Sequence, residues 1–219
     1  SGASGWMACP AWQGGGGSTK YSANGSVIHE VAADVIAGKR FGANDAIGER
    51  FSSGGFGITF DPDMAEIANV YVDYCNDLNN TLGGQPLVEL SLPIDLITGE
   101  PHAVSTIDFG LLPAPGKTEA CVVDLKTGAG VAVDAQDNPQ LAMYALAMLD
   151  EYALVADIKT VRMVIVQPPL NSISEWVQTV EELDVWRVRF ATAARAAMVE
   201  DPVPVPGDKQ CRWCSKKAD

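Results

Sequence analysis

The sequence predicts a mixed α/β fold. Short runs rich in β-branched and other apolar residues occupy the middle and the later part of the chain, as expected of buried strands. Segments with helical spacing of apolar residues lie before, between and after these runs. The expected order is helix, helix, three strands, helix, strand, helix. With 219 residues, of which 47% are hydrophobic, the chain can bury one core and is too short for two full domains.

The first part of the chain predicts a helix between two loops. Residues 11–25 are Gly-rich and predict a loop. Helical spacing begins near Ser26, a residue type that caps helix N-termini, and continues to Ile36. Gly38 can end this helix. Residues 42–60 are Gly-rich with aromatic residues and predict a mobile loop.

The rest of the chain predicts the sheet and the remaining helices, without an internal repeat. A long amphipathic helix is expected over Pro62–Leu82, where Gly83 and Gly84 end it. Asn138-Pro139, a cap residue followed by proline, predicts the start of a helix that runs to Tyr152. The other expected segments are strands at Pro86–Leu92, Val104–Phe109, Ala120–Lys126 and Val161–Val166, a short strand at Ile173–Thr179, a helix at Leu183–Glu200 and a proline-rich linker at Asp201–Pro206.

Charge and hydropathy restrict the class of function. No apolar run is long enough to span a membrane, and the N-terminus lacks the layout of a signal peptide. These observations predict a soluble, cytoplasmic protein with no membrane partner. The formal net charge of −13 argues against binding nucleic acid by general electrostatics alone. Any DNA contact would need a local basic patch or metal ions.

Asp124-Leu125-Lys126 is the most informative motif of the chain. It ends the apolar run that begins at Ala120 and precedes Thr127-Gly128. Since side chains alternate across a strand, Asp124 and Lys126 are expected on the same side. A carboxylate beside an ammonium group at a strand tip can hold a hard divalent cation, or it can be an ordinary ion pair.

Other polar residues have an ordinary explanation when each is taken alone. His29, beside Glu30 on an early helix, is more often a core or boundary residue than a metal ligand. Carboxylates in strands or at their ends, such as Glu89 and Asp108, are common and usually solvated. Gln140 and Tyr144 share a helix face four residues apart, which fits a half-buried tyrosine.

Taken together, these residues resemble the PD-(D/E)XK nuclease superfamily, with the RecB-type and Cas4-like exonucleases as the nearest branch. The resemblance lies in the order His29, Asp108, Asp124-x-Lys126 and Gln140-x-x-x-Tyr144 on the expected elements. The amino-acid sequence of several stretches resembles the phage and prophage family DUF2800 still more closely. These stretches are Val123–Gly128, Asn138–Leu141, Gln167–Pro169 and Gln210–Cys214.

The resemblance implies a restriction-endonuclease-like core, a mixed sheet flanked by helices, in one domain over residues 1–219. It implies Mg²⁺ or Mn²⁺ as cofactor, with the histidine favouring Mn²⁺. Lys126 would orient the attacking water and offset charge in the transition state. Gln140 and Tyr144 would position Lys126 or the DNA backbone, and Glu89 would be an outer acid. The implied metal ligands are His29, Asp108, Asp124 and the backbone carbonyl of Leu125.

The sequence departs from the superfamily pattern at two places. Ser105 stands where a Gly-x-x-Asp motif has glycine, and the stretch before His29 is Gly-rich rather than acidic. Neither departure removes an expected ligand. Gly128 and Gly130 would let the chain approach a phosphate closely.

The five cysteines fall into two groups. Cys75 and Cys121 lie in apolar segments and are expected to be core residues. Cys9, Cys211 and Cys214 match three of four positions that hold a [4Fe–4S] cluster in Cas4-like and AddB-like nucleases. This resemblance implies that residues 1–25 and 201–219 meet at a cysteine site. The fourth cysteine is absent from the sequence, so a zinc site is the alternative. Three unliganded thiols are less favoured than either site, because Cys211-x-x-Cys214 lies in a tail with little core of its own.

Two functions remain open on this basis. The first is a metal-dependent deoxyribonuclease, expected to be an exonuclease on single- or double-stranded DNA in phage replication or recombination. The second is a non-catalytic DNA-binding subunit with a nuclease fold in a larger assembly, together with phage recombination or replication proteins in the host cytoplasm. The net charge favours the second slightly, and the intact set of ligands with lysine favours the first more strongly.

Overall fold

The computed structural model describes residues 2–14, 17–212 and 214–216. Residues 1, 15–16, 213 and 217–219, which include parts of the expected cysteine region and Trp213 of the Gln210–Cys214 stretch, lie outside the described residues. Among the described residues, no helix combines the length and the apolar character that a membrane crossing requires.

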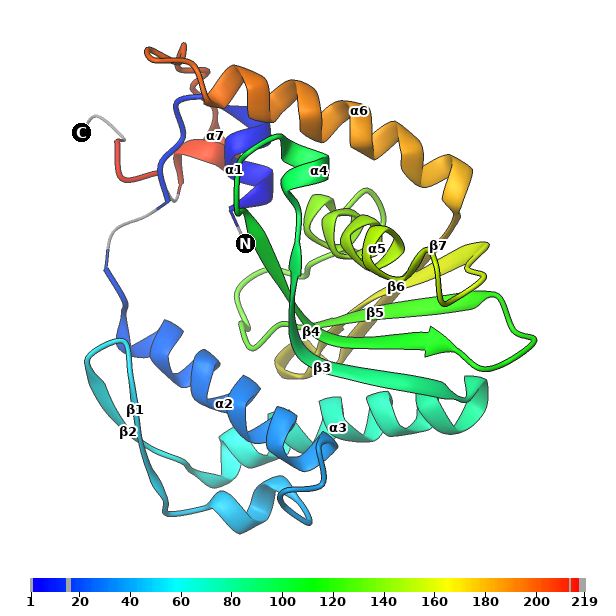
Figure 1. Cartoon of the computed structure of the whole chain (residues 1–219). Coiled ribbons are helices and arrows are strands. Elements are labelled where there is room, and N and C mark those ends of the chain that lie inside the picture. The colour runs from blue at the N-terminus through cyan, green and yellow to red at the C-terminus, as the bar shows by residue number, and fades with distance from the viewer. Residues whose placement is uncertain (1, 15–16, 213, 217–219) are drawn as a thin grey trace.

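A five-stranded mixed sheet forms the centre of the molecule, as predicted (Figure 1). Its order is β3-β4-β5-β6-β7, and every neighbouring pair is antiparallel except the parallel pair of β5 and β6. The helix between β5 and β6 makes the crossover that a parallel pair requires. The strand bounds are β3 (Gly84–Pro93), β4 (Val104–Pro113), β5 (Glu119–Leu125), β6 (Thr160–Gln167) and β7 (Ser172–Thr179).

Helices cover both faces of the sheet (Figure 1). The helices α2 (Lys20–Ile36) and α3 (Pro62–Leu82) lie on one face, and α5 (Pro139–Tyr152) lies on the other with α6 (Val180–Ala197) packed against it. The remaining elements are α1 (Ala3–Ala8), α4 (Asp95–Thr98), α7 (Asp208–Cys211), the 3₁₀ turns η1 (Ala43–Ala46) and η2 (Pro168–Leu170), and the hairpin of β1 (Arg50–Ser53) and β2 (Phe56–Thr59).

Strand β5 separates two hydrophobic cores and is buried along nearly its whole length. Val122 packs with α5 and α6, whereas Val123 packs with α2 and α3. This alternation follows from the two-residue period of a strand. Each fully buried aliphatic side chain contributes about 1.5–3 kcal/mol, so the tip of β5 projects from a strongly held part of the sheet.

The start of α2 differs from the sequence prediction. Thr19, not Ser26, is the N-cap, in a capping box with Ser22. Ser26 lies inside the helix, where its hydroxyl donates to the Ser22 carbonyl. Gly25, in the stretch predicted as a loop, is helical, and a Cβ at this position would lie 2.9 Å from Thr127 Oγ1. The glycine therefore serves close packing between helix and loop rather than ending the helix.

The predicted loop at 42–60 is wrong in part. It contains η1 and the β1–β2 hairpin, whose turn uses Gly54 and Gly55 at positive φ. Ile58 and Phe60 are buried in the α2/α3 core. The glycines here belong to a turn between strands, a distinction that the Gly-rich composition alone does not make.

The other predicted helices and strands are present with small shifts. Asn138 caps α5 through its side chain and Pro139 occupies the first turn, as predicted. The last helix begins at Val180 instead of Leu183, because Thr179 forms a capping box with Glu182. The short helices α1, α4 and α7 were not predicted; each spans six residues or fewer, too short for a clear helical period.

Candidate metal centre

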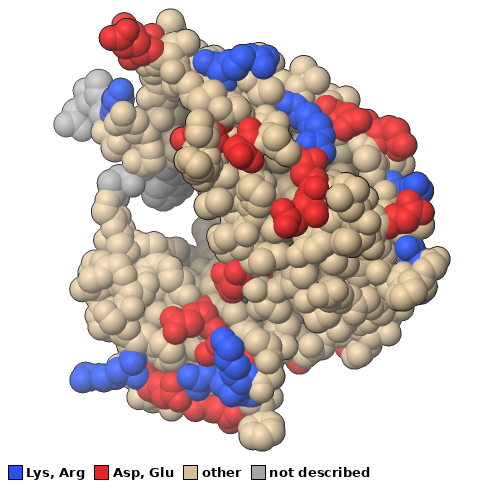
Figure 2. Space-filling model, in the orientation of Figure 1, with Lys and Arg blue, Asp and Glu red and all other residues tan. Residues whose placement is uncertain are grey.

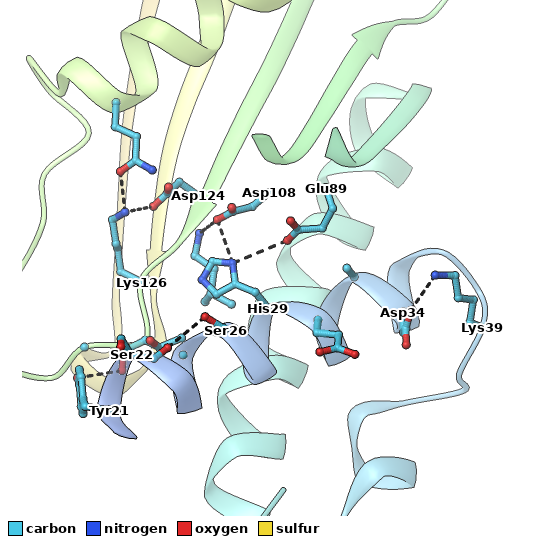
Figure 3. A pocket seen from close by; sticks show the side chains of 17 residues that line it. Tyr21, Ser22, Ser26, His29, Asp34, Lys39, Glu89, Asp108, Asp124 and Lys126 are labelled. Atoms are coloured by element: carbon cyan, nitrogen blue, oxygen red, sulfur yellow. Dashed lines mark hydrogen bonds and ion pairs between the residues drawn. The ribbon is translucent and has the colours of Figure 1, made fainter. Parts of the chain in front are cut away.

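A cleft of about 770 Å³ lies between α2, strands β3 to β5 and the loop that follows β5 (Figure 3). It contains most of the residues that the sequence singled out. They reach it from elements far apart in the chain: α2, β3, β4, the tip of β5 and the first turn of α5. The predicted residues in its lining are His29, Glu89, Asp108, Asp124, Leu125, Lys126 and Gln140.

His29, Glu89 and Asp108 form a compact group of potential metal ligands. His29 Nδ1 lies 3.4 Å from Asp108 Oδ2 and 3.9 Å from Glu89 Oε1. One ligand atom from each of the three residues lies within 4.8 Å of the other two. An imidazole and two carboxylates are a donor set that suits Mn²⁺ or Mg²⁺. Glu89, expected only as an outer acid, thus belongs to the group itself.

The pairing of β3 with β4 is interrupted at this group. The register is the same on both sides, yet Glu89 and Asp108, which would face each other, are not paired. The side-chain alternation also shifts here, because Ile107 packs with α5 whereas Phe109 packs with α2 and α3. Glu89 has a φ of +47°, which costs a non-glycine residue of order 1 kcal/mol. The backbone distortion brings both carboxylates to the α2 side, next to His29 (Figure 3).

Asp124 and Lys126 lie on the same side of the strand tip, as the motif predicted. Lys126 Nζ lies 2.6 Å from Asp124 Oδ2 and donates a hydrogen bond of 2.8 Å to Gln140 Oε1. The Gln140 amide in turn donates to the Tyr144 hydroxyl. This chain of contacts fixes the Lys126 ammonium at the cleft wall. The ordinary ion pair that the sequence left open is therefore present, but it lies inside the cleft beside the ligand group.

Leu125 connects the two groups through its backbone. Its N–H donates to Asp108 Oδ2 over 2.9 Å, whereas the next N–H, of Lys126, donates to the Val166 carbonyl on β6. In an extended strand the N–H and C=O of one residue point to the same edge. The Leu125 carbonyl is therefore directed to the β4 edge, the edge that carries Asp108.

Burial and neighbouring charges shift the ionisation of the site. Burial raises the pKa of Asp124 to about 6, although Lys126 opposes the shift. Burial also raises the pKa of Glu89, and Asp108 adds to that rise. For His29, burial lowers the pKa, but the contact with Asp108 and the nearby carboxylates outweigh it, so the pKa is raised. Carboxylates crowded in this way are stabilised by a bound cation, which supports the fit of a divalent metal.

Replacing Asp124 by asparagine is expected to stabilise the metal-free protein at neutral pH. A carboxyl whose pKa rises from 3.8 to about 6 on folding contributes stability below pH 4 that is lost as the pH rises through 6. Above pH 6 the variant avoids this loss, so its free energy of unfolding should exceed that of the wild type by on the order of 1–3 kcal/mol. Below pH 4 the two free energies of unfolding should be equal. Thermal unfolding in a chelating buffer at both pH values measures the difference.

Asp157→Asn is the matched control, because Asp157 forms an ion pair of the same 2.6 Å length with Lys159 but its side chain is 70% exposed. Its melting temperature is expected to stay within a degree or so of the wild type, as for most exposed ion pairs. A melting temperature of Asp124→Asn at or below that of the wild type at neutral pH would contradict the assignment of Asp124 as a strained, buried carboxylate.

The chain ends meet, but the three cysteines do not form a tight ligand group. Trp12 Nε1 donates to the Gln210 carbonyl, and Gly14 pairs with Cys214. Cys9 Sγ accepts a hydrogen bond from the Val205 N–H. Among the described residues, no three cysteine sulfurs come within the 4.8 Å that joins His29, Glu89 and Asp108. The cluster or zinc site at Cys9, Cys211 and Cys214 stays a prediction, whereas Cys75 and Cys121 are buried in the core as expected.

Several residues that line or support the cleft were not identified from the sequence, because they lie outside the recognised motifs. Tyr21 and Gly25 lie in the stretch predicted as loop, yet both line the cleft from α2. Gln167 stood out in the sequence only as part of a stretch that resembles DUF2800. Its buried side chain forms hydrogen bonds that hold the loop after β5. One signal was available: Gly25 precedes His29 by four residues, so on a helix both lie on one face.

Comparison with known proteins places the chain in a family. Among solved structures, it is similar to a protein described as "Crystal structure of SSO0001", at 15% identity and a TM-score of 0.32, over 70% of this chain and 74% of that one. A family model described as "Protein of unknown function (DUF2800)" matches residues 1–219, the whole sequence. The resemblance to DUF2800 in Val123–Gly128 and the three other stretches is thereby confirmed, and the chain belongs to the DUF2800 family.

Proposed function

We propose that this protein is a divalent-metal-dependent deoxyribonuclease, acting as an exonuclease. The observation that carries the proposal is the meeting of two groups in one cleft: the ligand group His29, Glu89 and Asp108, and the lysine of the Asp124-x-Lys126 motif. Four elements separated in sequence supply these residues. Such convergence is far more specific than any one of the residues alone.

The arrangement supports assignment to the PD-(D/E)XK superfamily. The residues of the predicted order lie on α2, β4, β5 and α5, around a mixed sheet with helices on both faces. We include in the proposal a restriction-endonuclease-like core, one domain over residues 1–219, and a role in phage replication or recombination with partner proteins in the host cytoplasm.

The side chains of the cleft have distinct tasks in phosphodiester hydrolysis. His29, Glu89 and Asp108 would hold Mg²⁺ or Mn²⁺, with Leu125 offering its carbonyl at the same edge. When bound, the metal supplies Lewis-acid polarisation of a phosphoryl oxygen and a more acidic water.

Lys126 acts beside this ligand group without belonging to it. Its ammonium, held by Asp124 and Gln140, can orient the attacking water and offset charge on the phosphoryl oxygens. Tyr144, through Gln140, limits the rotamers of this lysine. Because the ammonium is fixed before substrate arrives, little reorganisation is needed during the reaction.

The acidic surface bears on how DNA could bind. On the face shown in Figure 2, Lys and Arg do not form a continuous basic surface among the described residues, and Asp and Glu are interspersed with them. Together with the net charge of −13, this distribution favours binding of DNA through the cleft rather than through broad electrostatic attraction. The same net charge of −13 is the observation that favours the alternative, a DNA-binding subunit without catalysis in a larger assembly.

The proposal is tested by incubating the full chain with end-labelled single- and double-stranded DNA in Mn²⁺, in Mg²⁺ or in chelator. The expected result is shortening of the labelled strand only with metal, and its loss in Asp124→Ala. Asp157→Ala, which removes a carboxylate from an exposed ion pair with lysine, should cut like the wild type. Equal cutting by Asp124→Ala and wild type would refute the proposal, and binding without cutting by any form would establish the alternative.

A further inference from the structure

The cleft extends beyond the ligand group to an entrance formed by the first turns of α2 and the loop after β5 (Figure 3). Tyr21 stands at this entrance with 64% of its surface exposed. Its hydroxyl contacts the Thr127 carbonyl at 3.5 Å, and a Cβ on Gly128 would lie 3.2 Å from that hydroxyl. A largely exposed aromatic ring whose hydroxyl contacts the loop can serve as a platform for another flat group.

The wall opposite Tyr21 is held in place from inside the protein. Gln167 is only 2% exposed, and its amide donates to the carbonyls of Gly128 and Val131 over 2.6 and 3.0 Å. Its carbonyl accepts from the Val133 N–H over 3.0 Å. Because a buried amide uses three hydrogen bonds on this loop, the Thr127–Gly128 backbone is fixed relative to Tyr21. The entrance is thus a preformed slot.

The two ends of the cleft differ in charge. The entrance is lined by Tyr21, Ser22, Ser26 and the Thr127–Gly128 segment, and carries no carboxylate.

The opposite end is acidic. Glu30 and Asp34 line it, next to Glu89 of the ligand group. Asp34 is paired there with Lys39 at 2.9 Å and with Arg40 at 3.7 Å, whereas no described residue forms an ion pair with Glu30. Phosphates are therefore tolerated at the entrance and repelled beyond the ligand group.

We propose that the entrance slot binds the end of a single strand of nucleic acid, with a base stacked on Tyr21 and the strand terminating at the ligand group. The inference rests on the proposed function and names its substrate class. A base can lie on the ring only when it is released from a duplex stack, which selects single strands. The carboxylates of Glu30 and Glu89 at the far end oppose passage of the strand beyond the ligand group.

Binding is measured by fluorescence anisotropy of the full chain with fluorescein-labelled oligothymidylate in chelator, so that no hydrolysis occurs. Tyr21→Ala is expected to weaken binding by about 5- to 150-fold, the range found for loss of one base–aromatic stack. Tyr21→Phe keeps the ring and should bind like the wild type. Phe41→Ala, which removes another exposed ring that does not line the cleft, should also leave binding unchanged.

A competition arm tests the requirement for an end. Unlabelled linear oligothymidylate should displace the probe, whereas a covalently closed circle of the same sequence should compete at least about tenfold more weakly. Equal binding by Tyr21→Ala and wild type, equal competition by the circle, or no binding of the linear probe by the wild type would each overturn the inference. Hydrolysis is scored separately: a wild type that binds as expected but does not cut defeats the proposed function alone.

Discussion

Replacing Lys126 by methionine is expected to reduce metal-dependent DNA hydrolysis by about 10²- to 10³-fold, the usual cost of losing one preorganised charge-stabilising donor. Methionine keeps an unbranched stem of similar size, so packing at the cleft wall is retained. The loss falls on the ammonium that lies 2.6 Å from Asp124 Oδ2 and donates to Gln140. Single-turnover rates with saturating enzyme and Mn²⁺ report the chemical step directly.

Lys159→Met is the matched control for this experiment. Lys159 forms an ion pair with Asp157 at the same 2.6 Å distance, but its side chain is exposed and lies outside the cleft lining. Its loss should leave the rate unchanged within about twofold, as for a typical exposed pair. Mn²⁺ binding by Lys126→Met should also persist, since Lys126 is not a ligand. If Lys126→Met cut DNA at the wild-type rate, this lysine would be an ordinary ion-pair partner.

Replacing Asp108 by asparagine is expected to weaken Mn²⁺ binding by about 100-fold or more, beyond the 10- to 100-fold typical of groups that only support ligands. Asparagine can still accept the Leu125 N–H, so the strand contact survives while the charge next to His29 is lost. At a free Mn²⁺ concentration of one hundred times the wild-type Kd, the wild type gains about 2.7 kcal/mol of stability and the variant about 0.4 kcal/mol. Thermal unfolding with and without Mn²⁺ measures both.

Two comparisons make the Asp108 experiment specific. Asp61 caps α3 by accepting the Met64 N–H, and Asp61→Asn keeps that capability, so its Mn²⁺ response should equal that of the wild type. Glu89→Gln should weaken Mn²⁺ binding more than Asp124→Asn does, because Glu89 and not Asp124 belongs to the group within 4.8 Å. The reverse order would return Asp124 to the ligand role that the sequence resemblance assigned to it.

The sequence was most informative where local chemistry and burial agree. The run from Ala120 to Leu125 predicts a buried strand, and its two-residue period places Asp124 and Lys126 on one side. Asn138-Pro139 predicts the start of α5, and helix period then places Gln140 and Tyr144 on one face. These features depend only on neighbours along the chain, so they can be read without knowing the fold.

The sequence was least informative where the role of a glycine or a polar residue depends on a contact with a residue distant in the chain. Gly25 predicted a loop, but its lack of a Cβ accommodates Thr127, about one hundred residues away in the chain. The glycines at 54 and 55 predicted a mobile loop and form a hairpin turn that covers buried Phe60. In both cases the reason for the glycine is a tertiary or cross-strand contact.

The sequence by itself determined the fold class, most of the strands and helices, and the identity of the polar residues in the ligand group and around Lys126. These follow from periodicity, capping and side-chain chemistry, which act over a few residues. Only the tertiary structure decided which carboxylates meet His29. The backbone distortion of β3 opposite Asp108 directs the Glu89 side chain into the ligand group. The Asp124 side chain is instead directed to Lys126 on the α5 side. Packing of β3 and β4 between two cores sets that geometry, and no local pattern records it.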